Sequence, residues 1–177
     1  MIKIKLNQTE PNLYRVTLMI NEFMNEAIAL ARYLVTDNQG GPFGAVIVKD
    51  KQIIGRGSNQ VTSHNDPTAH AEIEAIRDAC QSLQSFSLHG CTLYSSSEPC
   101  PMCLSAIYWA RIEQVFFANT YKHAGEIGFD DQFIFQELNL AHKDKQLAIS
   151  RIKDKAILNS ALEVFKHWQH ISSRVRY

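Results

Sequence analysis

Two short stretches of the chain carry residues whose types and spacing fit a metal site. The first contains His70 and Glu72 as a His-x-Glu pair. The second contains Cys100 and Cys103 as a Cys-x-x-Cys motif that follows Pro99. One imidazole and two thiolates make a zinc site with only three protein ligands, which leaves a fourth position for water. Such a site indicates catalysis.

The same residues predict the type of reaction. Zinc lowers the pKa of its bound water towards neutrality, and Glu72 could deprotonate that water and pass the proton to a departing amine. Cys100 and Cys103 stand at the start of a predicted helix, where unpaired backbone N–H groups and the helix dipole favour thiolates. The expected products are therefore a carbonyl compound and ammonia.

A structural zinc site with four protein ligands is the main alternative. A single Cys-x-x-Cys motif is often half of such a site, and Cys80 or Cys91 could supply the missing ligand. Cys80, however, lies on the apolar stripe of a predicted helix, and Cys91 opens a predicted strand. Burial in the core explains both cysteines more simply.

Length and composition restrict the class of protein. The chain has 177 residues, of which 45% are hydrophobic, and this favours one domain with a substantial core. Eighteen basic residues balance eighteen acidic ones, which argues against nucleic acid or a membrane as partner and favours a small neutral substrate. Few cysteines, two of them with metal spacing, and the lack of an apolar leader predict a cytosolic protein.

The hydrophobic pattern predicts an α/β domain. Residues 43–48 form a continuous apolar run typical of a central strand, and residues 52–57 are expected to pair with it in antiparallel orientation. Strands over residues 92–95 and 115–118 should flank a helix over residues 101–110, which makes a βαβ unit. A fifth strand is expected over residues 147–152.

Three further helices are expected, over residues 21–35 with Asn21 as cap, over 66–83 with Asp66 as cap, and over 155–170. Pro67 fits the first position of the second helix. Both chemical motifs then stand at helix N-termini after strands, so the site is expected at the carboxyl edge of the sheet.

Residues 1–20 are interpreted as an N-terminal extension of unknown role, and residues 21–177 as the zinc-dependent domain with its tail. Two pieces of the extension, residues 2–6 and 13–20, alternate apolar and polar side chains. They are expected to form an edge hairpin or to pack loosely.

Four segments together resemble the guanine deaminases of the cytidine-deaminase superfamily. They are GGPFGAVIVKD at residues 40–50, NDPTAHAEI at 65–73, EPCPMCLSAIYWAR at 98–111 and GFDDQF at 128–133. The His-x-Glu and Pro-Cys-x-x-Cys motifs specify only the superfamily. GFDD, YWAR and the terminal Tyr177 narrow the resemblance, which extends from about residue 21 to the C-terminus.

This resemblance implies a three-layer α/β/α sandwich on a five-stranded mixed sheet, the cytidine-deaminase-like fold. It also implies one Zn²⁺ per chain and the hydrolysis of guanine, a small purine base, to xanthine and ammonia. A homodimer is expected, in which the C-terminal tail of each chain closes the active site of its partner. Tyr177 would then shut the pocket against water and hydrogen-bond the base.

The resemblance also implies a role for each matching residue. The zinc ligands would be His70, Cys100 and Cys103. Glu72 would be the general acid and base, and Asp131 would bind the purine ring and relay a proton. Asn59 would hydrogen-bond the base, while Phe43 and Trp109 would line an aromatic slot for it.

Other interpretations stay open from the sequence. The chain could be another deaminase of the superfamily, acting on guanosine, cytosine or a tRNA adenosine, although the charge balance argues against tRNA. It could also be a non-catalytic binding module that zinc stabilises. Ordinary core packing is the alternative for Phe43, and a frayed end is the alternative for the tail. Ammonia release from a panel of bases and nucleosides separates the three functions.

Overall fold

The computed structural model describes residues 10–36 and 40–176 of the chain. The chain divides into two compact units, Met1–Asp131 and Gln132–Tyr177, called here the N-terminal unit and the C-terminal unit. The expected extended piece at residues 2–6 lies outside the described residues, as does Tyr177. No helix among the described residues is long and apolar enough to span a membrane.

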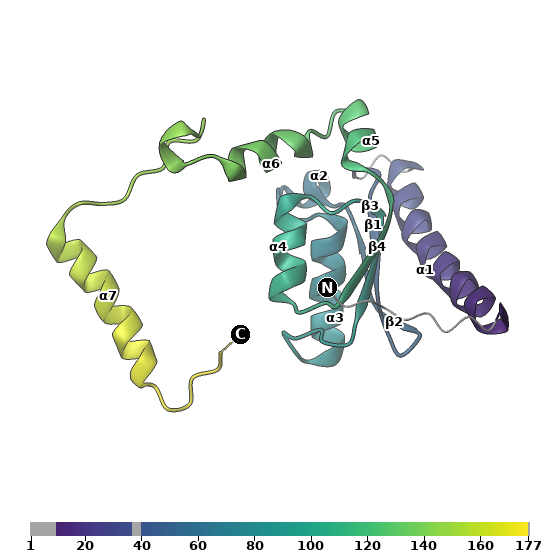
Figure 1. Cartoon of the computed structure of the whole chain (residues 1–177), viewed down its shortest axis with the longest axis horizontal. Helices are drawn as coiled ribbons and strands as arrows, with labels where there is room; N and C mark the ends of the chain where they lie inside the picture. Colours follow the sequence, from purple (N-terminus) through teal and green to yellow (C-terminus); the bar gives the residue numbers. More distant parts are fainter. Residues whose placement is uncertain (1–9, 37–39, 177) are drawn as a thin grey trace. The chain divides into compact units, whose positions relative to one another are not determined.

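The N-terminal unit is built on a mixed four-stranded sheet with the order β2-β1-β3-β4 (Figure 1). β1 (Gly44–Lys49) pairs in antiparallel orientation with β2 (Gln52–Ser58) and with β3 (Thr92–Ser97). β4 (Gln114–Asn119) runs parallel to β3. The predicted antiparallel pair and the predicted parallel pair of the βαβ unit are both confirmed.

The prediction of a fifth strand is wrong, because residues 147–152 are not in a strand. Leu147, Ile149 and Ile152 are between 40% and 70% exposed there. The segment belongs to the C-terminal unit, whose described residues include no strand. A strand needs a neighbour for its backbone hydrogen bonds, and alternating apolar residues cannot supply that neighbour.

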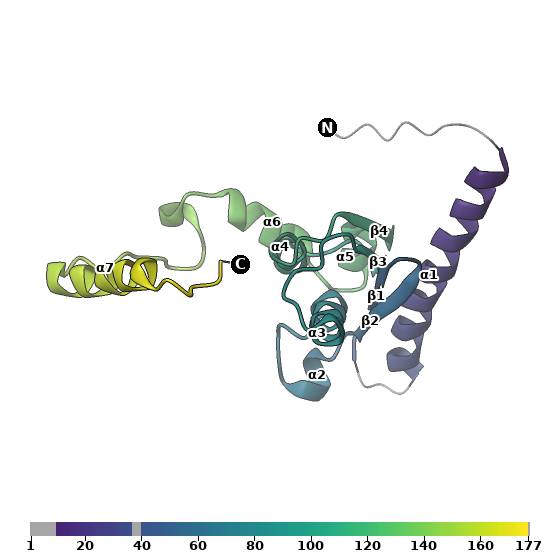
Figure 2. The same ribbon diagram turned by 90° about the horizontal axis from the view of Figure 1, so that it is seen from below.

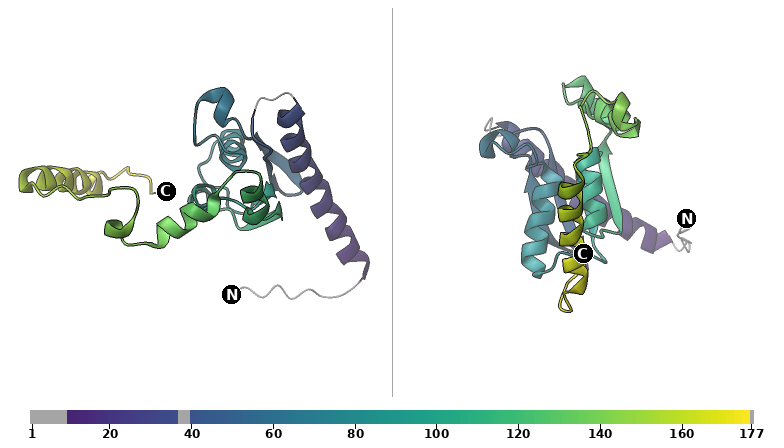
Figure 3. Two further views of the ribbon diagram at one scale, coloured as in Figure 1. Left: turned by 90° about the horizontal axis from the view of Figure 1, so that it is seen from above. Right: turned by 90° about the vertical axis from the view of Figure 1, so that its left-hand side faces the viewer.

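Helices cover both faces of the sheet, as Figures 1 and 3 show. α1 (Glu10–Thr36) packs against one face, and α3 (Ala71–Leu83) packs against the other beside α4 (Pro101–Trp109). The three-layer α/β/α sandwich is therefore confirmed, with four strands in place of the predicted five.

The side chains of the central strands alternate between the two helical layers. Val46 and Tyr94 belong to the cluster that packs against α1. Ile47 and Leu93, the next residue and the preceding one in their strands, belong to the larger cluster that includes the inner faces of α3 and α4. This alternation follows from the strand period of two residues and fills both sides of the sheet with apolar groups.

α1 begins much earlier than the sequence predicts. The expected extended piece at residues 13–20 is inside this helix, and Asn21 lies in its middle instead of at its cap. The apolar residues of that piece also fit a helical stripe, since Met19 and Phe23, one turn apart, pack in the same cluster. Pro11 does not oppose the helix, because it stands in the first turn, where no backbone hydrogen bond is lost.

α3, in contrast, begins later than predicted. His70 is its N-cap, with φ −72° and ψ 155°, and the helix starts at the next residue. Asp66 instead stabilises a turn that follows α2 (Val61–His64), where its Oδ1 accepts hydrogen bonds from the N–H and the hydroxyl of Thr68 at 2.8 and 2.7 Å. The Asp-Pro pair therefore caps a turn ahead of the helix, and the extended backbone of His70 directs its side chain.

Gly57 of β2 allows the site-bearing end of α3 to approach the sheet. A Cβ atom at this position would lie 2.0 Å from the carbonyl oxygen of Ala71 and 2.4 Å from the backbone nitrogen of Ala75. Any side chain would therefore push the first turns of α3 away from the sheet. The missing side chain at residue 57 fixes the position of a helix end that also carries Glu72.

The C-terminal unit consists of helices in which no described residue is buried. α6 (Asp131–Asn139), which starts at the boundary, and α7 (Lys155–His170) appear in green and yellow in Figure 2, with η1 (His142–Asp144) between them. The predicted helix over residues 155–170 is confirmed. It is capped by Asp154, whose Oδ1 accepts a hydrogen bond from the N–H of Ile157 at 3.0 Å.

Candidate active site

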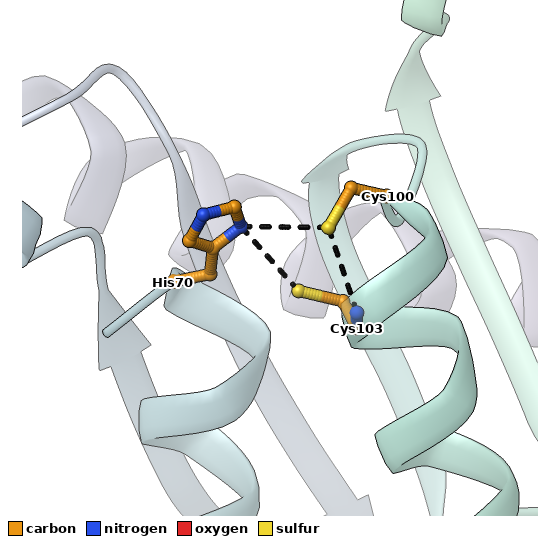
Figure 4. A group of neighbouring side chains, drawn as sticks. All are labelled: His70, Cys100 and Cys103. Carbon is orange, nitrogen blue, oxygen red and sulfur yellow. Dashed lines mark hydrogen bonds between the residues drawn. The ribbon is translucent and has the colours of Figure 1, made fainter. Parts of the chain in front are cut away.

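Three side chains at the N-terminal ends of α3 and α4 point towards a common centre (Figure 4). His70 is the N-cap of α3, Cys100 is the N-cap of α4, and Cys103 lies in the first turn of α4. His70 Nδ1 is 3.5 Å from Cys100 Sγ and 3.6 Å from Cys103 Sγ. Nitrogen and sulfur ligands at usual distances from a tetrahedral zinc ion are about 3.6 Å apart. The spacing of this triad therefore fits zinc.

The electrostatics of the triad also fit a dication. Hydrogen bonds from Cys103 and from His70 lower the pKa of the Cys100 thiol to about 4. The pKa of the Cys103 thiol is raised by its hydrogen bond with Cys100 and by burial. One thiolate is thus favoured and a second one beside it is opposed. A zinc ion between the sulfurs would supply the positive charge that lets both be thiolates.

A four-ligand structural site does not form from the other two cysteines. Among the described residues, the group of possible metal ligands consists of the triad alone. Cys80 and Cys91 are free thiols outside it, and burial raises the pKa of both. The predicted core positions of these two cysteines agree with this arrangement, since Cys91 is 1% exposed and Cys80 packs against the same apolar cluster.

Glu72 is the second residue of α3 and is only 5% exposed. Its Oε1 accepts a hydrogen bond from the hydroxyl of Ser95 at 3.0 Å, and its Oε2 lies 3.4 Å from Cys103 Sγ. Burial raises the pKa of this carboxyl group. The structure therefore places an ionisable group beside the triad in a setting that favours uptake of a proton.

A cavity of about 710 Å³ adjoins the triad. It has the size of a site for a small molecule, for which volumes of roughly 300–1,000 Å³ are typical. Its lining includes six residues that the sequence predicts for the site, namely Phe43, Asn59, His70, Glu72, Cys100 and Asp131. The fold therefore brings residues from Phe43 to Asp131, which lie far apart in the sequence, to the wall of one cavity.

Two polar side chains of the cavity wall can recognise a ligand. The Oδ1 atom of Asn59 accepts hydrogen bonds from the backbone N–H groups of Gly41 and Val61 at 3.2 and 3.4 Å. This orientation leaves the amide nitrogen of Asn59 as its donor to a ligand. Asp131 offers a carboxyl group, whose pKa is raised by burial and by the nearby charge of Cys100.

Aromatic residues also line the cavity, but not all those that the sequence predicts. The ring of Phe43 meets that of Phe129 edge to face, with the ring centroids 4.8 Å apart. Trp109, at the end of α4, is 64% exposed and is not among the residues that line this cavity. The observed aromatic wall therefore pairs Phe43 with Phe129.

Three residues of the site are absent from the sequence-based prediction. Phe129 belongs to the GFDD segment, so its position beside Asp131 gives a signal that points to it. Glu98 lines the cavity, and its Oε2 accepts a hydrogen bond from the N–H of Tyr121 at 3.1 Å, at the start of α5 (Tyr121–Glu126). Ser95 gives no signal, because a serine within a predicted strand has no distinctive spacing.

Comparison with known proteins gives matches over most of the chain. Residues 19–119 match the cytidine and deoxycytidylate deaminase zinc-binding region. The chain is 46% identical to guanine deaminase from Bacillus subtilis over 155 residues, which cover 88% of this chain and 97% of that protein. It is also 45% identical to tRNA-specific adenosine deaminase from Aquifex aeolicus over 105 residues, 59% of this chain and 68% of that one.

Comparison of the fold with solved structures agrees with the sequence comparison. The crystal structure of guanine deaminase from Bacillus subtilis matches with a TM-score of 0.84 and 44% identity, covering 89% of this chain and 98% of that chain. The matched zinc-binding region includes all three residues of the triad, and their donor atoms lie close enough together to hold one metal ion. The protein is therefore a zinc-dependent hydrolytic enzyme that belongs to the cytidine and deoxycytidylate deaminase family, and it is similar to a guanine deaminase along most of its length.

Proposed function

We propose that the enzyme hydrolyses guanine with one water molecule to xanthine and ammonia. The observation that carries this proposal is the buried carboxyl group of Glu72 beside the triad, in a cavity whose wall also holds Asn59 and Asp131. The similarity to a guanine deaminase extends well beyond the zinc-binding region of residues 19–119. This extent favours guanine over the substrates of relatives that match a shorter part of the chain.

The cavity wall complements the edge of a guanine base. Guanine is flat and presents ring N–H groups beside carbonyl and ring-nitrogen acceptors. The amide nitrogen of Asn59 can donate to an acceptor, and Asp131 can accept from a ring N–H. The rings of Phe43 and Phe129 provide an apolar wall for the base. An analogue that leaves one of the polar groups unpaired is expected to be a poor substrate.

Glu72 is proposed as the general acid and base. Zinc held by the triad would act as a Lewis acid and activate water for attack at the carbon that bears the amino group. Glu72, with its pKa raised by burial, takes up a proton more readily than an exposed glutamate and can deliver it to the departing amine. Asp131, whose pKa burial also raises, is proposed as a second group that relays a proton.

Ammonia release from guanine, guanosine, cytosine and a tRNA adenosine tests the proposal. Guanine is expected to react at least about 100-fold faster than the others at equal concentration, because the other substrates do not satisfy the same polar groups. Faster reaction of the tRNA would move the enzyme to the substrate class of its tRNA-modifying relatives. No ammonia from any substrate by the zinc-loaded protein would favour a non-catalytic binding module.

We also propose a homodimer in which the C-terminal tail of each chain closes the site of its partner. Apolar side chains of α7 support this, since Leu162 and Phe165 are 50% and 71% exposed and the unit itself buries none of its described residues. β4 is an edge strand of the sheet and leaves Phe117 44% exposed. Exposed apolar surface of this kind is typical of an interface.

The tail proposal is tested by deleting residues 172–177, which include Tyr177. The truncated enzyme is expected to keep its zinc and to lose much of its guanine turnover. Mixing it with full-length enzyme that carries Glu72→Gln should partly restore turnover, because a hybrid dimer joins one intact site to one intact tail. Full activity of the truncated enzyme alone, or a monomer at assay concentration, would contradict the proposal.

A further inference from the structure

Ser95 is a polar residue in an apolar part of the core. It lies within β3, is 1% exposed and pairs in the sheet with Ala45 of β1. Leu93 and Ala45, its neighbours on the same side of the sheet, belong to the core cluster beneath α3 and α4. A hydroxyl group buried in such a place is unfavourable unless it forms hydrogen bonds.

The hydroxyl proton of Ser95 is directed at the carboxyl group of Glu72. Its hydroxyl donates to Oε1 of Glu72 at 3.0 Å and accepts from the backbone N–H of Ser97 at 3.4 Å. A serine hydroxyl has only one proton to donate. That proton is therefore committed to Oε1, and the N–H of Ser97 occupies one of the acceptor positions.

This contact makes the two oxygens of the Glu72 carboxyl group different. Oε1 is held by Ser95, whereas Oε2 lies 3.4 Å from Cys103 Sγ, on the side of the metal ligands. The last torsion of a glutamate side chain has a broad energy minimum, so the carboxyl plane turns easily when no partner holds it. One hydrogen bond to one oxygen is enough to select an orientation.

We propose that Ser95 is a positioning residue, which holds Oε1 of Glu72 so that Oε2 is the oxygen that carries the proton between water and substrate. The inference rests on the proposed role of Glu72 in deamination. It adds a residue whose side chain does not line the cavity and which acts only through Glu72. A purely structural serine would instead matter for folding and leave the orientation of the carboxyl group unchanged.

Three substitutions at residue 95 separate these roles. Threonine keeps the hydroxyl group, and valine has nearly the same shape without it, so the Thr-to-Val comparison isolates the hydrogen bond. Ser95→Ala and Ser95→Val are expected to lower kcat about 10- to 100-fold, the usual range for loss of a hydrogen bond to a charged group. KM and zinc content should stay within about twofold of the wild-type values, since neither the cavity wall nor the triad changes. Ser95→Thr should keep most of the wild-type kcat.

Ser96→Ala is the matched control. This neighbour also lies in β3 and is buried, but its hydroxyl accepts a hydrogen bond from the N–H of Gly44 at 3.0 Å instead of contacting Glu72. The Ser96→Ala enzyme is expected to melt at a lower temperature and to keep its kcat. A kcat that follows the melting temperature across all four variants would overturn the proposal.

A double-mutant cycle with Glu72→Gln gives the decisive measurement. If Ser95 acts through Glu72, adding Ser95→Val to Glu72→Gln lowers kcat by less than threefold, although alone it lowers kcat at least about tenfold. Equal losses in both backgrounds, or equal kcat for the Thr and Val enzymes, would overturn the proposal. The ratios are measured on whichever base the substrate panel identifies. A failure of guanine as the substrate is therefore distinguishable from a failure of Ser95 as a positioning residue.

Discussion

The two units of the chain differ in how far they bury their apolar side chains. In the N-terminal unit, Ile47, Leu88 and Leu93 are fully buried, and the sheet is covered by helices on both faces. In the C-terminal unit, α7 has a clear amphipathic pattern, yet Phe165 and Val164 are 71% and 65% exposed. The first unit completes its core from its own residues, and the second does not.

This difference in burial predicts separate roles for the two units. Zinc binding and proton transfer require fixed side chains, and every residue proposed for them belongs to the well-packed N-terminal unit. An amphipathic helix whose apolar face has no cover within its own unit needs a surface from elsewhere. Changes in the N-terminal unit should therefore affect metal and chemistry, whereas changes on α7 should affect association.

Removal of the metal should have the largest effect. Cys103→Ser, or treatment with a strong chelator, is expected to abolish ammonia release. A catalytic zinc site needs three protein ligands, and the described triad has no ligand to spare. The zinc content measured by metal analysis should fall from about one ion per chain towards zero in that variant. Cys80→Ser is the control and should keep its zinc. Retention of zinc and activity by Cys103→Ser would remove this residue from the site.

Glu72→Gln should have the next largest effect. Glutamine keeps the size of the side chain but cannot carry a proton, so kcat is expected to fall about 10²- to 10⁴-fold with zinc retained. Glu74→Gln is a matched control on the same helix, since Glu74 forms an ion pair with Arg77 at the surface. Steady-state kinetics and metal analysis check both variants. Similar losses in the two would point to damage of α3 instead of lost chemistry.

Gly57→Ala should show how tightly the site-bearing helix is packed. The added Cβ would meet the backbone of Ala71 at 2.0 Å, and helix backbone cannot move aside as a flexible side chain can. The expected loss of stability is about 1–3 kcal/mol or more, measured by denaturant unfolding. At Gly125 a new Cβ meets nothing within 4 Å, so Gly125→Ala should be neutral or stabilising by up to about 1 kcal/mol.

Asp131→Asn tests substrate recognition by the last residue of the N-terminal unit. An amide presents a donor where the ring N–H of guanine needs an acceptor, so kcat/KM for guanine should fall roughly 10- to 100-fold. The melting temperature should change little, because Asp131 is only partly buried. Asp130→Asn is the exposed neighbouring control. A wild-type kcat/KM in Asp131→Asn would show that residues 128–133 do not read the base.

Phe165→Glu should have the smallest effect on the N-terminal unit and a selective effect on association. A charge on the exposed apolar face of α7 opposes burial against a partner, so sedimentation should show weaker self-association. Zinc content should be unchanged and stability should shift by no more than about 0.5 kcal/mol. Gln169→Glu adds the same charge at an exposed polar position of α7 and should leave association unchanged.

The proximity of the three triad side chains was predictable from the sequence for a local reason. Cys100 and Cys103 are three residues apart, so the first turn of a helix brings their sulfurs together without help from the rest of the fold. Coordination chemistry then restricts the remaining ligand to a few residue types, among which His70 has the right neighbour in Glu72. The continuous apolar run at residues 43–48 and the amphipathic pattern at residues 155–170 likewise predicted β1 and α7 from local sequence.

The contacts that complete the site depend on the tertiary structure. Ser95 and Glu72 are 23 positions apart in the sequence. Their side chains meet because of the register of β3 in the sheet and because Gly57 lets the start of α3 approach the sheet closely. The pairing of Phe43 with Phe129 likewise joins segments that no local period relates.

Sequence alone thus determined which atoms can bind zinc and move a proton, because these are properties of residue types at short spacing. Tertiary structure decided where α3 starts, with His70 as its cap instead of a residue within it. It also decided that residues 147–152 are not a strand in their own unit. The physical reason is common to these cases: caps, strands and buried polar contacts depend on a partner, and the partner is distant in the sequence.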